Sequence, residues 1–143
     1  MGDLLLEMVV LFYLCGRQQT VGETPPPGRA LSPLQLPTGE TFFRGPHVIP
    51  TAPLAEAFGH DAKRFLRAGA ALGGRAWNRG EASFVLTVLP FVEMHFILYG
   101  ADDEFPAKAT LLVSETIDHY LTLDAVWGLC NVVVKRILEF KDT

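Results

Sequence analysis

Apolar residues recur at helical spacing in four segments, at 3–15, 53–58, 61–72 and 123–140. Spacings of three and four residues are typical of helices that bury one face. Gly16 follows the first segment and Gly73 follows the third, and a glycine at such a position favours the end of a helix. Thr122 precedes the last segment, where its hydroxyl is suited to cap the first turn. The pattern therefore predicts four helices.

Extended segments follow the third helix. The run 83–100 is rich in β-branched and aromatic residues on both sides of Pro90-Phe91, which predicts a β-hairpin, and the run 108–114 predicts a third strand. Prolines interrupt residues 31–45, which predicts short extended pieces at a sheet edge or in irregular segments. With a two-residue hairpin connection, regular pairing places His95 on the same face as Leu86, which favours an interior histidine over a ligand.

The order of these elements predicts the fold class. Helices come first, then the hairpin and the third strand, and a helix closes the chain. This order predicts an α+β fold, with a small antiparallel sheet built on a central β-hairpin and packed against N- and C-terminal helices. A length of 143 residues fits one domain over residues 1–143.

Composition and charge narrow the classes of function. Hydrophobic residues make up 49% of the chain and charged residues 20%, which is typical of a globular protein. The net charge is −4, and no more than two Lys or Arg residues are adjacent. Nucleic-acid binding needs a concentrated positive surface, so we expect no nucleic-acid partner.

The cysteines and the first residues predict the location. Cys15 and Cys130 both lie in apolar helical segments without a C-x-x-C pattern, which favours a reducing compartment. The opening segment lacks a basic start, carries Glu7 and is too short to cross a bilayer. We therefore expect a cytoplasmic protein without a membrane span.

An acidic cluster separates the hairpin from the third strand. Asp102, Asp103 and Glu104 lack the ligand spacing of a calcium loop, and they fit either a solvated turn or a binding site. Phe105 and Pro106 follow directly. We expect the ring of Phe105 to pack this turn against the body of the protein and so to hold the acids in place.

A histidine–tyrosine pair lies between the third strand and the last helix. Histidine in general is suited to acid–base chemistry, so His119 is a candidate for that role, whereas the alternative is that His119 and Tyr120 only cap and pack. No two of the four histidines have ligand spacing, and no nucleophile elbow or phosphate loop is present. The sequence thus predicts neither a metal nor a cofactor.

Four segments together resemble one known family, and they read LPTGETFFRG, PLAEAFGHDAKRFLRAGAALGG, EASFVLTVLPFVEMHFILYGADDEFPAKATLLVSE and HYLTLDAVWGL. Over about residues 30–138, their order and spacing are similar to the family numbered 3786 among domains of unknown function, which occurs in bacteria and archaea. The positions that match the family pattern are Phe43, Phe58, Asp103, Glu104, Phe105, Pro106, His119, Tyr120 and Leu121.

The resemblance implies a setting but no activity. Some relatives are joined to iron–sulfur modules or occur in organisms rich in corrinoid and anaerobic redox chemistry. This chain departs from the family at Ala30 and Pro33, where relatives carry a tryptophan-containing segment, and relatives are commonly longer at the N-terminus. From this difference we expect a short version of the family domain, whose sheet is either incomplete or completed by a partner. An incomplete sheet leaves an unpaired edge, which would allow a homodimer.

Three functions follow from these observations. The first is a ligand- or protein-binding accessory module in anaerobic iron–sulfur or corrinoid metabolism, with a groove formed by Asp103, Glu104, Phe105, Pro106, His119 and Tyr120. The second is a small enzyme that uses His119 with Asp103 or Glu104 for acid–base chemistry. The third is a structural protein that pairs through a sheet edge. The partner is a protein or a small molecule.

Overall fold

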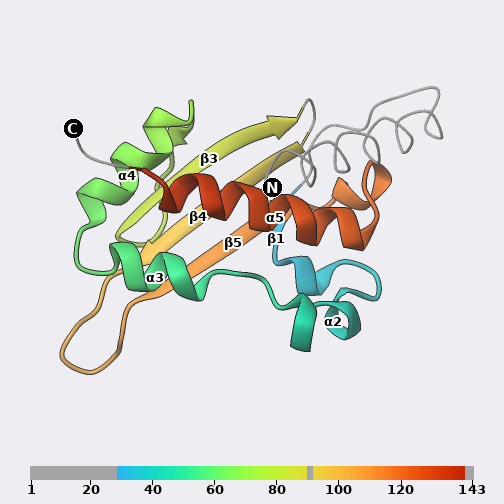
Figure 1. Cartoon of the computed structure of the whole chain (residues 1–143), viewed down its shortest axis with the longest axis horizontal. Helices are drawn as coiled ribbons and strands as arrows, with labels where there is room; N and C mark the ends of the chain where they lie inside the picture. Colours follow the sequence, from blue (N-terminus) through green and yellow to red (C-terminus); the bar gives the residue numbers. More distant parts are fainter. Residues whose placement is uncertain (1–28, 90–91, 141–143) are drawn as a thin grey trace.

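The structure, a computed structural model, describes residues 29–89 and 92–140 (Figure 1). The helix predicted at residues 3–15 lies outside this part of the chain. The helices are α2 (Gly39–Phe42), α3 (Ala52–Phe58), α4 (Ala62–Ala71) and α5 (Leu123–Leu138), and the short 3-10 helices are η1 (Pro33–Gln35), η2 (Gly45–His47) and η3 (Ile117–His119). The strands are β1 (Ala30–Leu31), β2 (Arg75–Ala76), β3 (Ala82–Leu89), β4 (Val92–Tyr99) and β5 (Lys108–Ser114).

The five strands form one antiparallel sheet in the order β1-β5-β4-β3-β2. The three long strands occupy the centre, and each edge strand contains two residues. The helices precede and follow these central strands, so the fold belongs to the α+β class with a central hairpin, as predicted. The hairpin and the third strand are confirmed. Whether residues 1–143 form a single domain stays a prediction.

A shift in the pairing of β3 with β4 sets the two faces of the sheet. The register changes between Thr87 and Leu89, which leaves Val88 as a bulge. A regular hairpin with the same connection would place His95 opposite Leu86. The bulge instead pairs His95 with Val85, so the prediction that His95 shares a face with Leu86 is wrong. One extra residue in a strand is enough to turn the residues beyond it to the other face.

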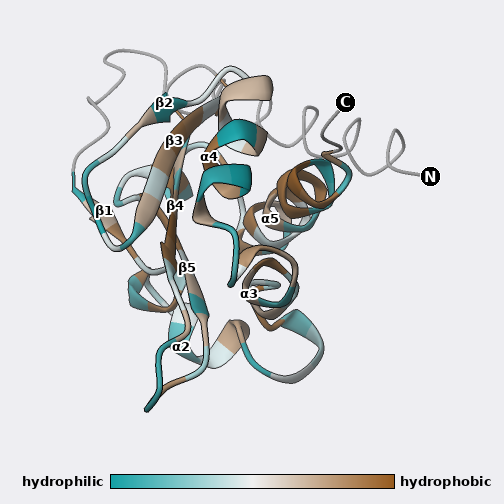
Figure 2. Cartoon of the chain, turned by 90° about the vertical axis from the view of Figure 1, so that its left-hand side faces the viewer, coloured by the Kyte–Doolittle hydropathy of each residue, from teal (hydrophilic) through white to brown (hydrophobic). Residues whose placement is uncertain are grey.

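The helices cover one face of this sheet. Figure 2 shows α3, α4 and α5 together on one side of the strands. The strand residues that point toward the helices are buried with them in one core, and they are Ala82, Phe84, Leu86, Met94, Phe96, Leu98, Ala109, Leu111 and Val113. These three helices leave the opposite face of the sheet uncovered.

Local sequence explains where the two longest helices begin and end. The Thr122 hydroxyl accepts a hydrogen bond from the Ala125 amide, and the Asp61 carboxylate accepts one from the Arg64 amide. Both are N-cap contacts that satisfy a free helix donor. Gly73 follows α4 with a φ of 84°, a conformation that suits glycine. The predicted cap of the last helix is therefore confirmed.

One detail of the first helices differs from the predictions. Residues 40–45 were expected to be extended or irregular, but Gly39–Phe42 forms α2, because the Thr38 carbonyl accepts hydrogen bonds from the amides of Thr41 and Phe42. In α4, Phe65 is buried in the core, whereas Leu66 and Leu72 are 37% and 41% exposed, so they lie outside the buried face of this helix.

Close packing between α4 and β3 gives a test of the core. A Cβ atom at Gly69 would lie 2.5 Å from two ring carbons of Phe84. We therefore expect Gly69→Ala to lower the free energy of unfolding by roughly 1–2 kcal/mol, although alanine favours a helix by about 1 kcal/mol. Denaturant unfolding measures the change. Ala70→Gly, on the exposed side of α4, reports helix propensity alone, and a gain of stability in Gly69→Ala would contradict the packing.

Candidate functional site

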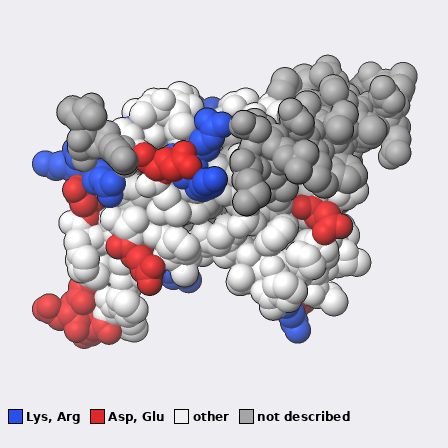
Figure 3. Space-filling view, viewed as in Figure 1, with Lys and Arg blue, Asp and Glu red and all other residues white. Residues whose placement is uncertain are grey.

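The predicted acidic cluster lies on the loop between β4 and β5. Residues 101–106 are all exposed. In Figure 3, acidic side chains protrude at the lower left, where Figure 1 places this loop. The loop therefore presents Asp103 and Glu104 to solvent, away from the hydrophobic core.

Hydrogen bonds centred on Asp102 fix the tip of this loop. The Asp102 carboxylate accepts hydrogen bonds from the amides of Glu104 (2.8 Å) and Phe105 (2.7 Å). The Asp102 amide in turn donates to the Phe105 carbonyl at 3.0 Å. An aspartate that bonds the amides ahead of it closes a turn locally. The tip is thus held by Asp102, through contacts within the loop itself.

Phe105 does not anchor the loop. Its side chain is 67% exposed, the largest fraction among the exposed large hydrophobic residues of the described chain. The expectation that its ring packs against the body is therefore wrong. The Asp102 turn already closes the loop, so no aromatic contact is needed, and the ring points outward with Pro106 beside it in sequence.

The histidine–tyrosine pair lies in a different place. His119 is the last residue of η3, the element that follows β5, and is exposed, whereas Tyr120 is 1% exposed and belongs to the core. A residue this deeply buried contacts the interior and offers little surface to a ligand. Of the pair, only His119 is accessible to solvent.

The strand β5 separates the two parts of the predicted groove. The acidic loop precedes β5 and the turn with His119 follows it, and seven residues of strand span about 20 Å. A carboxylate and a histidine must lie within hydrogen-bond reach, or be bridged by one water, to exchange a proton. The structure therefore does not bring His119 together with Asp103 or Glu104 into one groove.

A second group of polar residues lies on the sheet face that the helices leave open. Arg75 on β2 pairs with Glu93 on β4 at 3.2 Å, and Glu93 lies 3.9 Å from the Nε2 atom of His95. The indole of Trp77 packs edge-on against the imidazole, with ring centroids 4.7 Å apart. This cluster was not predicted from the sequence, because the bulge at Val88 places His95 on this face.

His95 favours its neutral form. Its side chain is only 12% exposed, and its Nδ1 atom is buried without a hydrogen-bond partner in the described structure. Burial lowers the pKa of His95 below the ordinary value of 6.5, and Arg75 lowers it further, while Glu93 opposes both effects. The imidazole is thus a neutral polar group between an ion pair and an indole.

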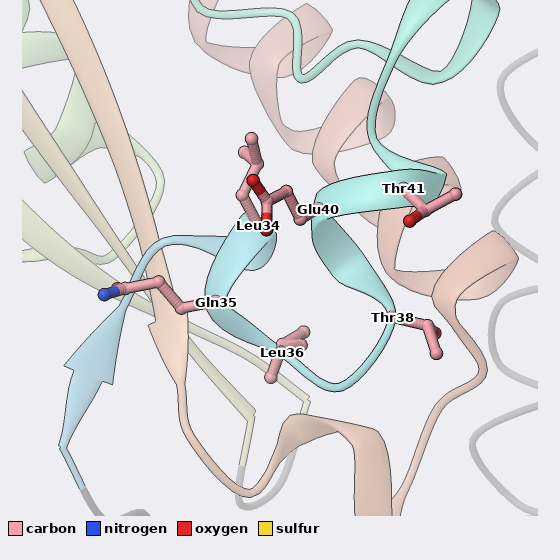
Figure 4. A pocket seen from close by; sticks show the side chains of 6 residues that line it. All are labelled: Leu34, Gln35, Leu36, Thr38, Glu40 and Thr41. Atoms are coloured by element: carbon pink, nitrogen blue, oxygen red, sulfur yellow. The ribbon is translucent and has the colours of Figure 1, made fainter.

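A cavity of about 530 Å³ lies beside α2. Figure 4 shows that its polar side chains diverge, with Gln35 pointing to one side and Thr38 and Thr41 to the other. Thr38 has a φ of 61°, a left-handed conformation that is unusual for a β-branched residue. Because the polar groups do not converge, this cavity lacks the arrangement of a binding site.

Two smaller cavities lie near the sheet edges. One of about 370 Å³ runs between α3 and the start of β5, next to the acidic loop, and its lining includes Thr51, Glu56 and Lys108. The other, of about 270 Å³, lies between α4, β3 and α5. His119 lines neither of these two cavities, nor the one beside α2.

The described residues contain no group of three or more His, Cys, Asp or Glu side chains placed to hold a metal ion. The thiol of Cys130 is fully buried in α5, and burial raises its pKa to about 12. Such a thiol is protonated at neutral pH and therefore unreactive. None of the described helices combines the length and the apolar content that a membrane span requires.

Comparison with known proteins identifies one family. The model of a domain of unknown function, DUF3786, matches residues 2–136, in agreement with the resemblance seen in the sequence. Neither the curated proteins nor the solved structures include a significant match.

The lowered pKa of His95 predicts a dependence of stability on pH. The unfolded chain takes up a proton near pH 6.5, whereas the folded chain does so only at lower pH. The stability contributed by the neutral imidazole is therefore present above pH 6.5. It is lost as the pH falls toward the pKa that His95 has in the folded chain. Between about pH 7.5 and pH 5.5, we expect the wild type to lose more unfolding free energy than His95→Gln.

Urea unfolding at the two pH values measures this difference, and His60→Gln, at an exposed position, serves as the matched control. The assignment to His95 would be contradicted if the wild type and His95→Gln lost the same unfolding free energy between the two pH values. It would also be contradicted if His60→Gln reduced this loss as much as His95→Gln does.

Proposed function

The chain belongs to the DUF3786 family, a domain of unknown function, and we propose that it is a protein-binding module that uses the β4–β5 loop as its recognition surface. Asp103, Glu104, Phe105 and Pro106 form this surface. The observation that carries the proposal is the exposure of Phe105, which is 67% accessible on a turn fixed by hydrogen bonds.

An exposed aromatic side chain on a rigid turn suits protein recognition. Aromatic residues are enriched among the few side chains that dominate binding energy at interfaces. A turn already ordered before binding loses little conformational entropy when the partner docks. The three hydrogen bonds around Asp102 provide that order, so the ring of Phe105 is presented in one defined region.

The charges of the loop define the chemistry of the partner. Asp103 and Glu104 stand beside Phe105 in sequence and are exposed. Neither carboxylate has an ion-pair partner in the described structure. Complementary potential favours a partner segment that carries Lys or Arg beside an apolar residue. We therefore propose a basic, partly apolar peptide segment as the ligand.

The surroundings of the loop leave room for an extended segment. On the side of β5 away from β4, the strand β1 pairs only with Val113 and Ser114, so no other strand of the described chain lies along that side of β5. The 370 Å³ cavity lies along the same stretch, with Lys108 and Ala109 in its lining. A peptide that adds as a strand to such an edge gains backbone hydrogen bonds.

The open edge also favours a second candidate function, pairing between two copies of this chain. An unpaired strand is a template for another strand, including a copy of itself. Light scattering over a range of concentrations distinguishes the candidates. A molecular mass that doubles as the concentration rises supports self-pairing. A mass that stays at the monomer value argues against self-pairing and supports binding of a different partner at this edge.

The setting of the module is part of the proposal. The family resemblance implies anaerobic metabolism with iron–sulfur or corrinoid chemistry, so the partner would be a protein of that metabolism. We also propose a cytoplasmic location, on the basis of the two cysteines in apolar segments.

Substitution of Phe105 tests the recognition surface. We expect peptides selected on the wild-type protein from a random library to be enriched in Lys and Arg. Phe105→Ala should weaken their binding about 30-fold, as expected for an aromatic residue that dominates an interface. Fluorescence anisotropy with labelled peptides measures the affinity. Unfolding free energy should change little, because the ring is exposed.

Two matched variants serve as controls. Val48→Ala truncates another exposed apolar residue, and Asp118→Asn removes an exposed acid beyond the far end of β5. Both should bind as the wild type does, whereas Asp103→Asn should bind more weakly and with less dependence on salt. Failure to select any peptide, or equal affinity for Phe105→Ala and the wild type, would refute the proposal.

A further inference from the structure

An apolar groove lies between the end of α4, the end of β3 and α5, away from the β4–β5 loop. Its volume is about 270 Å³. Six of its lining residues are aliphatic, and they are Leu72, Leu86, Val88, Leu129, Val132 and Val133. Ligand sites of proteins are mostly apolar concavities with a small number of polar groups, and this groove has that composition.

The groove reaches from the core to the surface. Leu86 and Leu129, at 4% and 2% exposed, belong to the hydrophobic core, whereas Leu72 is 41% exposed. On the side of β3 away from β4, the strand β2 pairs only with Phe84 and Val85, so no strand of the described structure lies beside Thr87 on that side. The groove is therefore open to solvent on the side of the sheet edge.

One charged side chain contributes to the lining. Arg136 lies in the last turn of α5 and is exposed. It has no ion-pair partner among the described residues. A guanidinium recognises a carboxylate through two parallel hydrogen bonds. An apolar groove beside an unpaired guanidinium is complementary to a molecule with an apolar body and an anionic end.

We propose that this groove binds a small amphipathic carboxylate, with its aliphatic chain among the six apolar residues and its carboxylate on Arg136. A cavity of about 150 Å³ holds benzene, so a groove of this volume suits a chain of about eight carbons. The site is separate from the loop proposed for protein recognition, and it uses none of the same residues.

Octanoate, octanol and two substitutions in α5 test the site. We expect octanoate to shift the amide NMR resonances of Leu72, Val88 and Val132 in the intact protein. Arg136→Gln should weaken octanoate binding about fivefold, the upper range for a partly exposed ion pair, and should leave octanol binding unchanged. Lys135→Gln is the matched control, since Lys135 is the neighbouring exposed cation in the same last turn.

The outcomes separate this site from others. A selective loss of octanoate affinity in Arg136→Gln supports the proposal, and unchanged octanoate binding in Phe105→Ala shows that the loop is not involved. Resonance shifts elsewhere, equal affinities for octanoate and octanol, or equal losses in Arg136→Gln and Lys135→Gln would overturn it. Absence of any shift at millimolar octanoate would also overturn it.

Discussion

The bulge at Val88 is the constraint on which the remaining structure depends. Because of it, Leu86 pairs with Met94 and His95 pairs with Val85. The paired residues Phe84 and Phe96, whose rings stack 5.4 Å apart, then face the helices with the other large side chains of the hairpin. A regular register would exchange the faces of one strand and would direct His95 into the core, where an unpaired imidazole is costly.

The helices cover only one face of the sheet, so the surfaces that a ligand can reach lie at the rim of the sheet and on its open face. The helices occupy the core side, so the β4–β5 loop, the exposed edge of β5 and the groove beside Arg136 all lie at the boundary of the two layers. The polar cluster around His95 lies on the open face. Surfaces at separate places on one rigid core can bind different molecules independently.

The sequence was sufficient for the elements whose signal is local. The strand at residues 108–114 and the cap at Thr122 were predicted correctly, because alternation and capping depend on neighbouring residues. The bulge has no such local signal, so the face of His95 was predicted wrongly. Whether the ring of Phe105 packs inward or points to solvent depends on tertiary contacts, which the neighbouring residues in the sequence do not reveal. The separation of His119 from the acidic loop follows from strand geometry, since residues on either side of one strand lie at opposite ends of it.

The self-contained turn at Asp102 has an evolutionary consequence. Its hydrogen bonds involve only the loop, and the neighbouring side chains at 103, 104 and 105 add nothing to the core. Replacing these side chains therefore costs the fold little, so specificity can diversify by point substitution while the scaffold is preserved. The proposed recognition surface is thus uncoupled from folding, which would give such a protein a simple route to new interactions.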